Sequence, residues 1–153
     1  MKVSKAATCA AAASLLAIGG LGVMSTPAQA ASPVQITKVY VNSPGSDLPT
    51  TNAKVNSEYT VIKNTGTSTQ TMTGWTLRDQ SNHVYKFGTF SLGAGKTVVL
   101  RTGKGTNSAT TRFWGSSYYI WNNTGDTAYL RNAAGTTMDS CAWTTTAPGY
   151  KNC

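Results

Sequence analysis

The chain contains few groups suited to acid–base chemistry. Its 153 residues include 5 Asp and Glu and a single His, and charged residues of both signs make up only 12% of the sequence. A hydrolytic triad needs a histidine beside a nucleophile and an orienting acid, and no G-x-S-x-G motif accompanies His83. The composition therefore argues against an enzyme. A secreted hydrolase, with Glu58 and a second acid in a cleft, is the less favoured alternative.

Long apolar runs are also lacking, except at the N-terminus. Two lysines, Lys2 and Lys5, precede an apolar stretch over residues 6–23, and Ala28-Gln29-Ala30 follows as a small-residue cleavage site. This order predicts a secretory signal peptide over residues 1–30. We expect a mature chain of residues 31–153 in the extracellular space or the cell envelope. Removing two of the 13 Lys and Arg leaves a mature charge of 11 − 5 = +6.

Cysteine is scarce, and its positions are informative. Cys9 lies in the leader, so Cys141 and Cys153 are the pair that remains after processing. An even number of cysteines in an exported chain predicts a disulfide. The alternative, a pair of metal-ligating thiols, would need a second Cys or His pair. We therefore expect no metal site and no cofactor, with a Ca²⁺ ion near Asp126 left open.

No helical periodicity is visible, whereas strand-forming residues are abundant. The mature chain has 23 Thr, and all 14 aromatic residues of the sequence belong to it. Alternating apolar positions, interrupted by turn residues, predict strands over 34–41, 58–64, 73–79, 84–87, 97–101, 127–131 and 137–143. The turns at 79–82 and 132–135 predict hairpins, with Asn82 and Gly135 in the left-handed conformation. Seven short strands favour a single antiparallel β-sandwich, with a small barrel as the alternative.

Four segments in order resemble the lamin-tail domain, as found in exported bacterial proteins. They are E-Y-T-V-I-K-N at 58–64, G-W-T-L-R-D at 74–79, F-S-L-G-A-G at 90–95, and W-N-N-T-G-D at 121–126. The resemblance implies an immunoglobulin-like sandwich over residues 31–153 that serves as a non-catalytic binding or structural module. The residues that carry it are Glu58, Tyr59, Asn64, Trp75, Leu77, Trp121, Asn122, Gly125 and Asp126.

One segment combines cations and aromatic residues more densely than the rest. The candidate ligand-binding residues are Arg101, Lys104, Arg112, Trp114 and Tyr118. Exposed aromatic side chains beside cations can stack on bases or sugars and neutralise phosphate. We expect the three cations to be exposed in a long loop. The competing interpretation is that Trp114, Tyr119 and Trp121 pack beneath this loop as core.

Together these features predict a secreted, basic, monomeric binding module. Its ligand would be an acidic polymer, either nucleic acid or an acidic polysaccharide of the cell envelope. The alternative is a small secreted inhibitor that inserts a loop, such as residues 103–117, into the active site of another protein. The identity of the ligand does not follow from the sequence.

Overall fold

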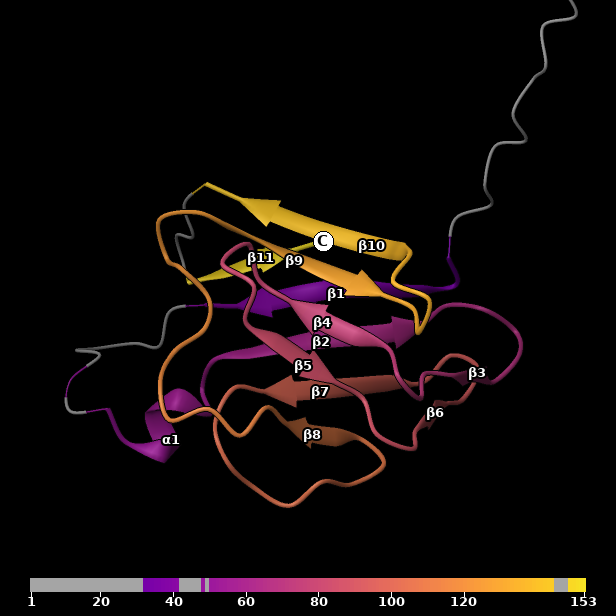
Figure 1. Ribbon diagram of the computed structural model, residues 1–153, viewed down its shortest axis with the longest axis horizontal. Helices are drawn as coiled ribbons and strands as arrows, with labels where there is room; N and C mark the ends of the chain where they lie inside the picture. Colours follow the sequence, from indigo (N-terminus) through magenta and orange to yellow (C-terminus); the bar gives the residue numbers. More distant parts are fainter. Residues whose placement is uncertain (1–31, 42–47, 49, 145–148) are drawn as a thin grey trace, which may run out of the picture.

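Two β-sheets pack face to face in this computed structural model (Figure 1), which describes residues 32–41, 48, 50–144 and 149–153. The five-stranded sheet has the order β11 (Tyr150–Asn152), β1 (Val34–Tyr40), β2 (Tyr59–Asn64), β7 (Thr97–Arg101) and β8 (Thr111–Phe113). The four-stranded sheet has the order β10 (Thr137–Trp143), β9 (Asp126–Arg131), β4 (Thr76–Arg78) and β5 (Val84–Lys86). A separate pair joins β3 (Gln70–Thr71) to β6 (Ser91–Leu92).

The pairing is antiparallel except between β7 and β8, which run parallel. The prediction of an all-β, immunoglobulin-like sandwich is thus confirmed. Within the described residues, no helix is long and apolar enough to cross a membrane.

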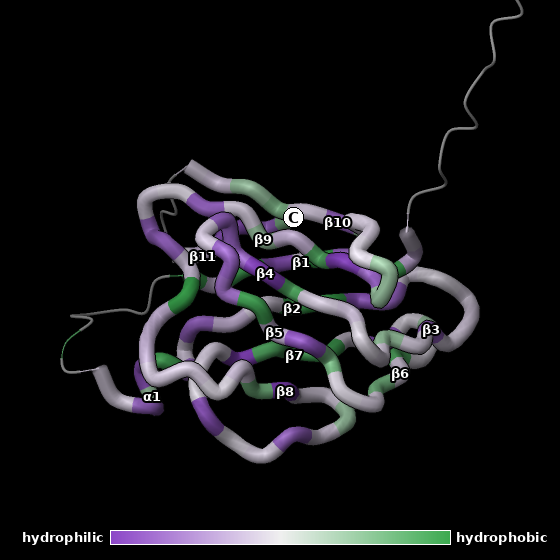
Figure 2. Tube along the Cα trace, viewed as in Figure 1, coloured by the Kyte–Doolittle hydropathy of each residue, from purple (hydrophilic) through white to green (hydrophobic). Residues whose placement is uncertain are grey.

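Alternating side chains build the core between the sheets. The five-stranded sheet contributes Ile62 and Leu100, and the four-stranded sheet contributes Leu77 and Leu130, all fully or almost fully buried. Neighbouring residues on each strand point to the opposite face, because the side-chain period of a strand is two. Figure 2 shows hydrophobic positions along the strands, interspersed with paler and hydrophilic ones. Trp75, with 6% of its surface exposed, belongs to the same buried core as Leu77.

Both predicted left-handed turn positions are confirmed. Asn82 has a φ of 70° between β4 and β5, and Gly135 has a φ of 84° between β9 and β10. At the second turn the amide of Gly135 donates to the carbonyl of Asn132, and the strand register shifts by one residue at Met138. This shift is the bulge that accompanies such a turn.

Other predicted boundaries were wrong. The strand expected over 73–79 is limited to β4, because the chain turns at Gly74 (φ 79°) and Thr73 is exposed. The long loop expected over 103–117 contains β8, and a strand that was not predicted, β11, precedes Cys153. A single helical turn, α1 (Asn52–Val55), is capped by the Thr51 hydroxyl and is too short to leave a periodic pattern. The predicted leader, residues 1–30, lies outside the described residues.

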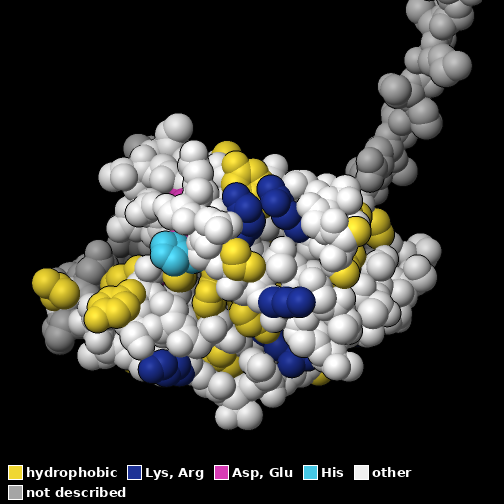
Figure 3. All heavy atoms as spheres, viewed as in Figure 1, with side chains coloured by type: hydrophobic (Ala, Val, Ile, Leu, Met, Phe, Trp, Pro, Cys, Tyr) yellow, Lys and Arg dark blue, Asp and Glu magenta, His cyan; other side chains and the backbone are white. Residues whose placement is uncertain are grey.

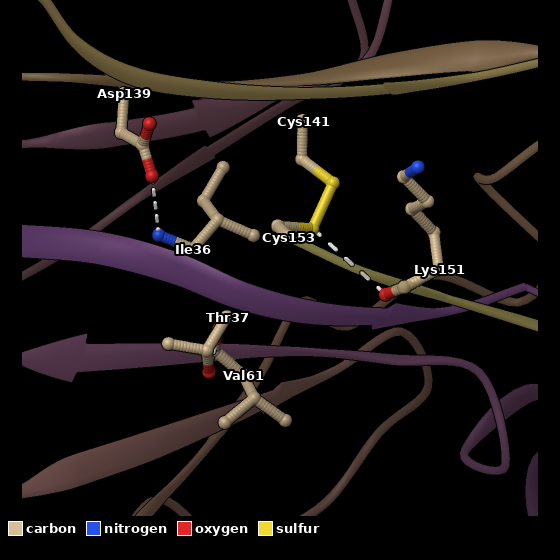
Figure 4. Close-up of a disulfide and its surroundings, with 7 residues drawn as sticks. All are labelled: Ile36, Thr37, Val61, Asp139, Cys141, Lys151 and Cys153. Carbon is tan, nitrogen blue, oxygen red and sulfur yellow. Dashed lines mark hydrogen bonds between the residues drawn. A yellow bond between two sulfur atoms is a disulfide. The ribbon is translucent and has the colours of Figure 1, made fainter.

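The two sheets are cross-linked along the side formed by β1, β10 and β11. Cys141 of β10 is bonded to Cys153, which follows β11, with their Cα atoms 5.8 Å apart, so the predicted disulfide is confirmed. Close by, the Asp139 carboxylate of β10 accepts a hydrogen bond from the Ile36 amide of β1 at 2.7 Å (Figure 4). Both links hold the four-stranded sheet against the five-stranded one on this side.

Candidate functional site

The predicted ligand-binding residues do not form one cluster. Arg101 lies opposite Phe113 in the parallel β7–β8 register, so the side chain of Arg112, one residue earlier, points to the other face of the sheet. Arg101 lies 5.6 Å from the centre of the Tyr59 ring and donates a hydrogen bond to the carbonyl of Asn56 at 2.6 Å. The guanidinium of Arg112 lies 4.3 Å from the centre of the buried Phe90 ring.

The expected exposure holds for only one of the three cations. Lys104 is exposed, whereas Arg101 and Arg112 are half-buried. The reason is that β7 and β8 draw both arginines into the sheet, where aromatic rings cover them. Tyr118 is exposed over 72% of its surface. It is not the ring that contacts either arginine, since Arg101 lies over Tyr59 and Arg112 over Phe90.

Trp114 and Trp121 belong mainly to a chain of aromatic packing. Trp121 is buried, as predicted, and its ring lies 5.9 Å from that of Trp114 and 5.8 Å from that of Trp143. Trp114 is half-buried and also contacts Tyr85, at 5.9 Å between ring centres. These contacts favour the core interpretation for both tryptophans.

Glu58, which the hydrolase alternative placed in a cleft with a second acid, is fully buried. Its two carboxylate oxygens accept hydrogen bonds from the backbone amides of Ile120 and Trp121, at 2.8 and 2.9 Å. Burial raises the pKa of Glu58 from 4.5 to about 7, although the two amide donors act in the opposite direction. Glu58 therefore anchors the segment that carries Trp121 to the start of β2.

Three other carboxylates make the same kind of contact. Asp126 accepts from the amides of Gln80, Thr127 and Asn122, at 3.0, 2.7 and 3.1 Å. Asp79 accepts from the amide of His83 at 2.7 Å and from its ring nitrogen at 2.6 Å, and Asp139 bonds to Ile36 as described above. Amide donors thus occupy both oxygens of Asp126, where a Ca²⁺ ion was considered. Within the described residues, no three His, Cys, Asp or Glu side chains are grouped to hold a metal ion.

Cations, in contrast, gather on the outer surface of the four-stranded sheet. Figure 3 shows Lys and Arg side chains spread over this side of the molecule, with almost no Asp or Glu surface visible. The group on the sheet itself consists of Arg78 of β4, Lys86 of β5 and Arg131 of β9, around Tyr129, and we call these four residues the cation face. None of its three cations has a carboxylate partner in the described part of the chain.

Strand pairing fixes the spacing of the cation face. Arg131 and Lys86 both pair with Thr76, from either side, so their Cα atoms lie about 10 Å apart, which is two strand spacings. Arg78 is two residues along β4 from Thr76, about 7 Å away. Its guanidinium and that of Arg131 lie 5.6 and 5.9 Å from the centre of the Tyr129 ring. The three charges form a triangle on the outer surface of the sheet, where Lys86 is exposed and Arg78 and Arg131 are half-buried against the Tyr129 ring.

Sequence reasoning missed the cation face, although part of its signal was present. The turn at Asn82 pairs Arg78 with Val84 and Thr76 with Lys86, so the shared face of Arg78 and Lys86 could have been inferred. Arg131 could not have been placed there, because the pairing of β4 with β9 joins segments about fifty residues apart in the chain. Only the tertiary structure brings these strands together.

The fold and these contacts define a class: an immunoglobulin-like β-sandwich whose described acids hold backbone amides and whose four-stranded sheet carries cations on its outer surface. Residues 27–145 match the lamin tail domain family, and the protein belongs to that family. No curated protein sequence matches the chain. The resemblance found in the sequence is thus confirmed at the level of the family, which leaves the ligand and the biological role to be proposed.

Proposed function

We propose that this lamin tail domain protein is an exported, non-catalytic module that binds acidic polymers through the cation face. One observation carries the proposal: each described Asp and Glu side chain accepts a hydrogen bond from at least one backbone amide, while Arg78, Lys86 and Arg131 share the outer surface of one sheet with no counter-charge among the described residues. Such a surface attracts polyanions and releases their counterions on binding. Nucleic acid and acidic polysaccharide share the chemistry that this surface recognises.

The site proposed from the structure replaces the segment proposed from the sequence. Arg101 and Arg112 are held by aromatic rings on different faces of the five-stranded sheet, which prevents them from acting together on one polymer. Lys104, the third member, remains exposed and supplies one charge. The inhibitor alternative gains no support, because the disulfide lies at β11, at the opposite end of the sheet from the 103–117 segment around β8.

Titration with two polymers at two salt concentrations tests the proposal. The probes are a fluorescent single-stranded DNA oligomer and a labelled acidic polysaccharide. Three neutralised phosphates give a slope of about −2 for log K against log salt concentration on a single strand. Replacing Arg78, Lys86 and Arg131 by Gln should remove most of this slope. The matched control replaces three exposed lysines elsewhere, Lys96, Lys104 and Lys151, by Gln.

The outcomes separate a site from diffuse attraction. Equal losses from the two triple variants would mean that any cation serves, which contradicts a dedicated face. A larger loss of polymer binding on replacing Arg101, Lys104 and Arg112 would indicate that the binding site lies in the segment predicted from the sequence. Absence of binding to either polymer at low salt would contradict polyanion binding altogether.

Export is part of the same proposal and has its own measurement. The charged, apolar and small-residue regions within residues 1–30 support it. Intact-mass analysis of protein recovered from the medium should give Ala31 as the first residue and a mass two hydrogens below the reduced form. Retention of residues 1–30 in the recovered protein would contradict cleavage at this site.

A further inference from the structure

The outer face of the five-stranded sheet carries a continuous row of large side chains, one on each strand. The register pairs Tyr150 with Tyr40, Tyr40 with Tyr59, Tyr59 with Arg101, and Arg101 with Phe113. The row therefore crosses all five strands and spans about 19 Å, which is four strand spacings. All five side chains are half-buried, so each keeps part of its surface in solvent.

The three tyrosines, Tyr150, Tyr40 and Tyr59, form a stack that we call the tyrosine row. The ring of Tyr40 lies 5.2 Å from that of Tyr59 and 6.1 Å from that of Tyr150, with interplanar angles of 5° and 13°. Cations flank both ends: the Lys38 ammonium lies 4.4 Å from the centre of the Tyr150 ring, and the Arg101 guanidinium lies 5.6 Å from that of Tyr59.

The stack determines which parts of the rings meet solvent. Tyr40 is stacked between the other two rings, and Arg101 lies over Tyr59, so the row offers mainly ring edges and phenol hydroxyls. Aromatic edges are electropositive, and a phenol hydroxyl both donates and accepts hydrogen bonds. In the described part of the chain, none of the three hydroxyls has a hydrogen-bond partner, and none is buried.

The charges beside the tyrosine row indicate which class of ligand it could bind. Lys38 and Arg101 border it, Lys63 lies on the same face, and the described carboxylates all point elsewhere. A nucleic acid would need several open ring faces on which successive bases could stack, and the stacked arrangement of the tyrosine row leaves few of them. A ligand rich in hydroxyls and carboxylates complements phenol hydroxyls flanked by cations.

From this geometry we infer that the tyrosine row binds an acidic polysaccharide chain, with sugar hydroxyls bonded to the phenols and carboxylates paired with Lys38 and Arg101. This site lies on the sheet opposite the cation face and does not depend on it. Inorganic polyphosphate differs from a uronic acid chain in offering acceptors only, so it would leave the donor–acceptor capacity of the phenols unused.

The test uses three polymers that separate charge from hydroxyls. They are polygalacturonate, its methyl ester with the same hydroxyls but no charge, and inorganic polyphosphate. Binding is measured with the mature chain and with the variant in which Arg78, Lys86 and Arg131 are Gln, so that the cation face does not mask the second site. Replacing Tyr40, Tyr59 and Tyr150 by Phe removes three hydroxyls and keeps the rings stacked, which preserves the fold.

We expect the Tyr→Phe triple variant to bind polygalacturonate and its methyl ester at least about tenfold more weakly, since each lost hydrogen bond contributes modestly. Polyphosphate binding should not change. Lys38→Gln should weaken polygalacturonate but not the methyl ester. The matched control, Tyr118→Phe, alters an exposed tyrosine outside both the row and the cation face and should bind all three polymers like the unmodified chain.

Several results would overturn the inference. Unchanged polygalacturonate binding in the Tyr→Phe triple variant would do so, as would absence of binding by the unmodified chain. Equal weakening of polygalacturonate and polyphosphate would reveal a general anion surface instead of a sugar site. In each case the cation face could still bind polyphosphate and DNA with its own salt dependence, so failure here is distinguishable from failure of the proposed function.

Discussion

The interior carboxylates and the cation face use charge in opposite ways. Glu58, Asp79, Asp126 and Asp139 point inward and hold backbone amides of loops or of a facing strand. The cations Arg78, Lys86 and Arg131 point outward and contact aromatic rings or solvent. A chain with few acids has therefore used the described ones to fix its connections, and this leaves its surface positive.

The difference predicts how each group responds to substitution. A buried acceptor that holds an amide cannot be removed without leaving that amide unsatisfied, which costs free energy. An exposed cation without a counter-charge can be removed with little effect on folding, because water replaces its contacts. Stability should therefore depend on the acids, and binding on the cations.

The largest effect is expected at Asp126, which accepts from three amides in two connections. Asp126→Ala should lower the free energy of unfolding by about 3–5 kcal/mol, because several partly buried donors lose their acceptor together. Urea denaturation followed by tryptophan fluorescence measures this change. Lys86→Ala, at an exposed position on the other side of β4, is the control and should stay within about 0.5 kcal/mol of the unmodified protein. Equal effects of the two substitutions would contradict the view that the buried carboxylates stabilise the fold and the surface cations do not.

The second effect is a pH dependence at Glu58. Its pKa rises from 4.5 to about 7 on folding, so the folded protein holds this proton more tightly than the unfolded chain does. The resulting stabilisation is complete below pH 4.5 and is lost as the pH rises through about 7. Its size is on the order of 3 kcal/mol. Urea denaturation at a series of pH values between 4.5 and 8 measures the slope.

Glu58→Gln provides the matched comparison for that slope. Gln cannot ionise, so the difference in unfolding free energy between the two proteins should vary with pH, while other titrating groups cancel. A difference that stays constant across this range would contradict the raised pKa of Glu58. A difference that grows with pH in favour of the unmodified protein would mean that the amides of Ile120 and Trp121 outweigh burial.

The smallest effect on folding is expected at the cation face. Replacing Lys86 by Gln should change the free energy of unfolding by less than about 0.5 kcal/mol, and replacing Arg78 or Arg131, which are half-buried against Tyr129, by less than about 1 kcal/mol each. At low salt the triple variant should gain slightly, because three like charges within about 10 Å repel one another over less than a Debye length. Thermal unfolding at two salt concentrations measures this. A loss above about 1 kcal/mol per arginine would show that contacts with Tyr129 stabilise the sheet.

Local sequence patterns were sufficient to predict much of the fold. Trp75 and Leu77 alternate as core residues, and Asn82 and Gly135 occupy left-handed turns, because period and turn chemistry act between near neighbours. The pairing of Cys141 with Cys153 was predicted from the expected export of the chain and from the even number of cysteines that remain after processing. Strands β3, β6, β8 and β11 were missed, since strands of two or three residues bear no recognisable period and form through their partners.

The candidate sites were less accessible to such reasoning. Arg101, Lys104 and Arg112 are close in sequence, yet a strand separates the two arginines onto opposite faces. The cation face and the tyrosine row each combine residues from strands far apart in the chain. Grouping by proximity in sequence therefore selected residues that do not act together.

By itself, the sequence determined the all-β class, the family, the two hairpin turns, the disulfide pair and the scarcity of acids. Each of these depends on composition or on contacts between near neighbours. The tertiary structure alone decided which strands lie side by side. It places Arg131 and Lys86 on either side of β4, and it places Tyr40 between Tyr150 and Tyr59. It also buries Glu58 against the backbone of Trp121. The physical reason is that non-local strand pairing is selected by the packing of the whole core, which no short segment encodes.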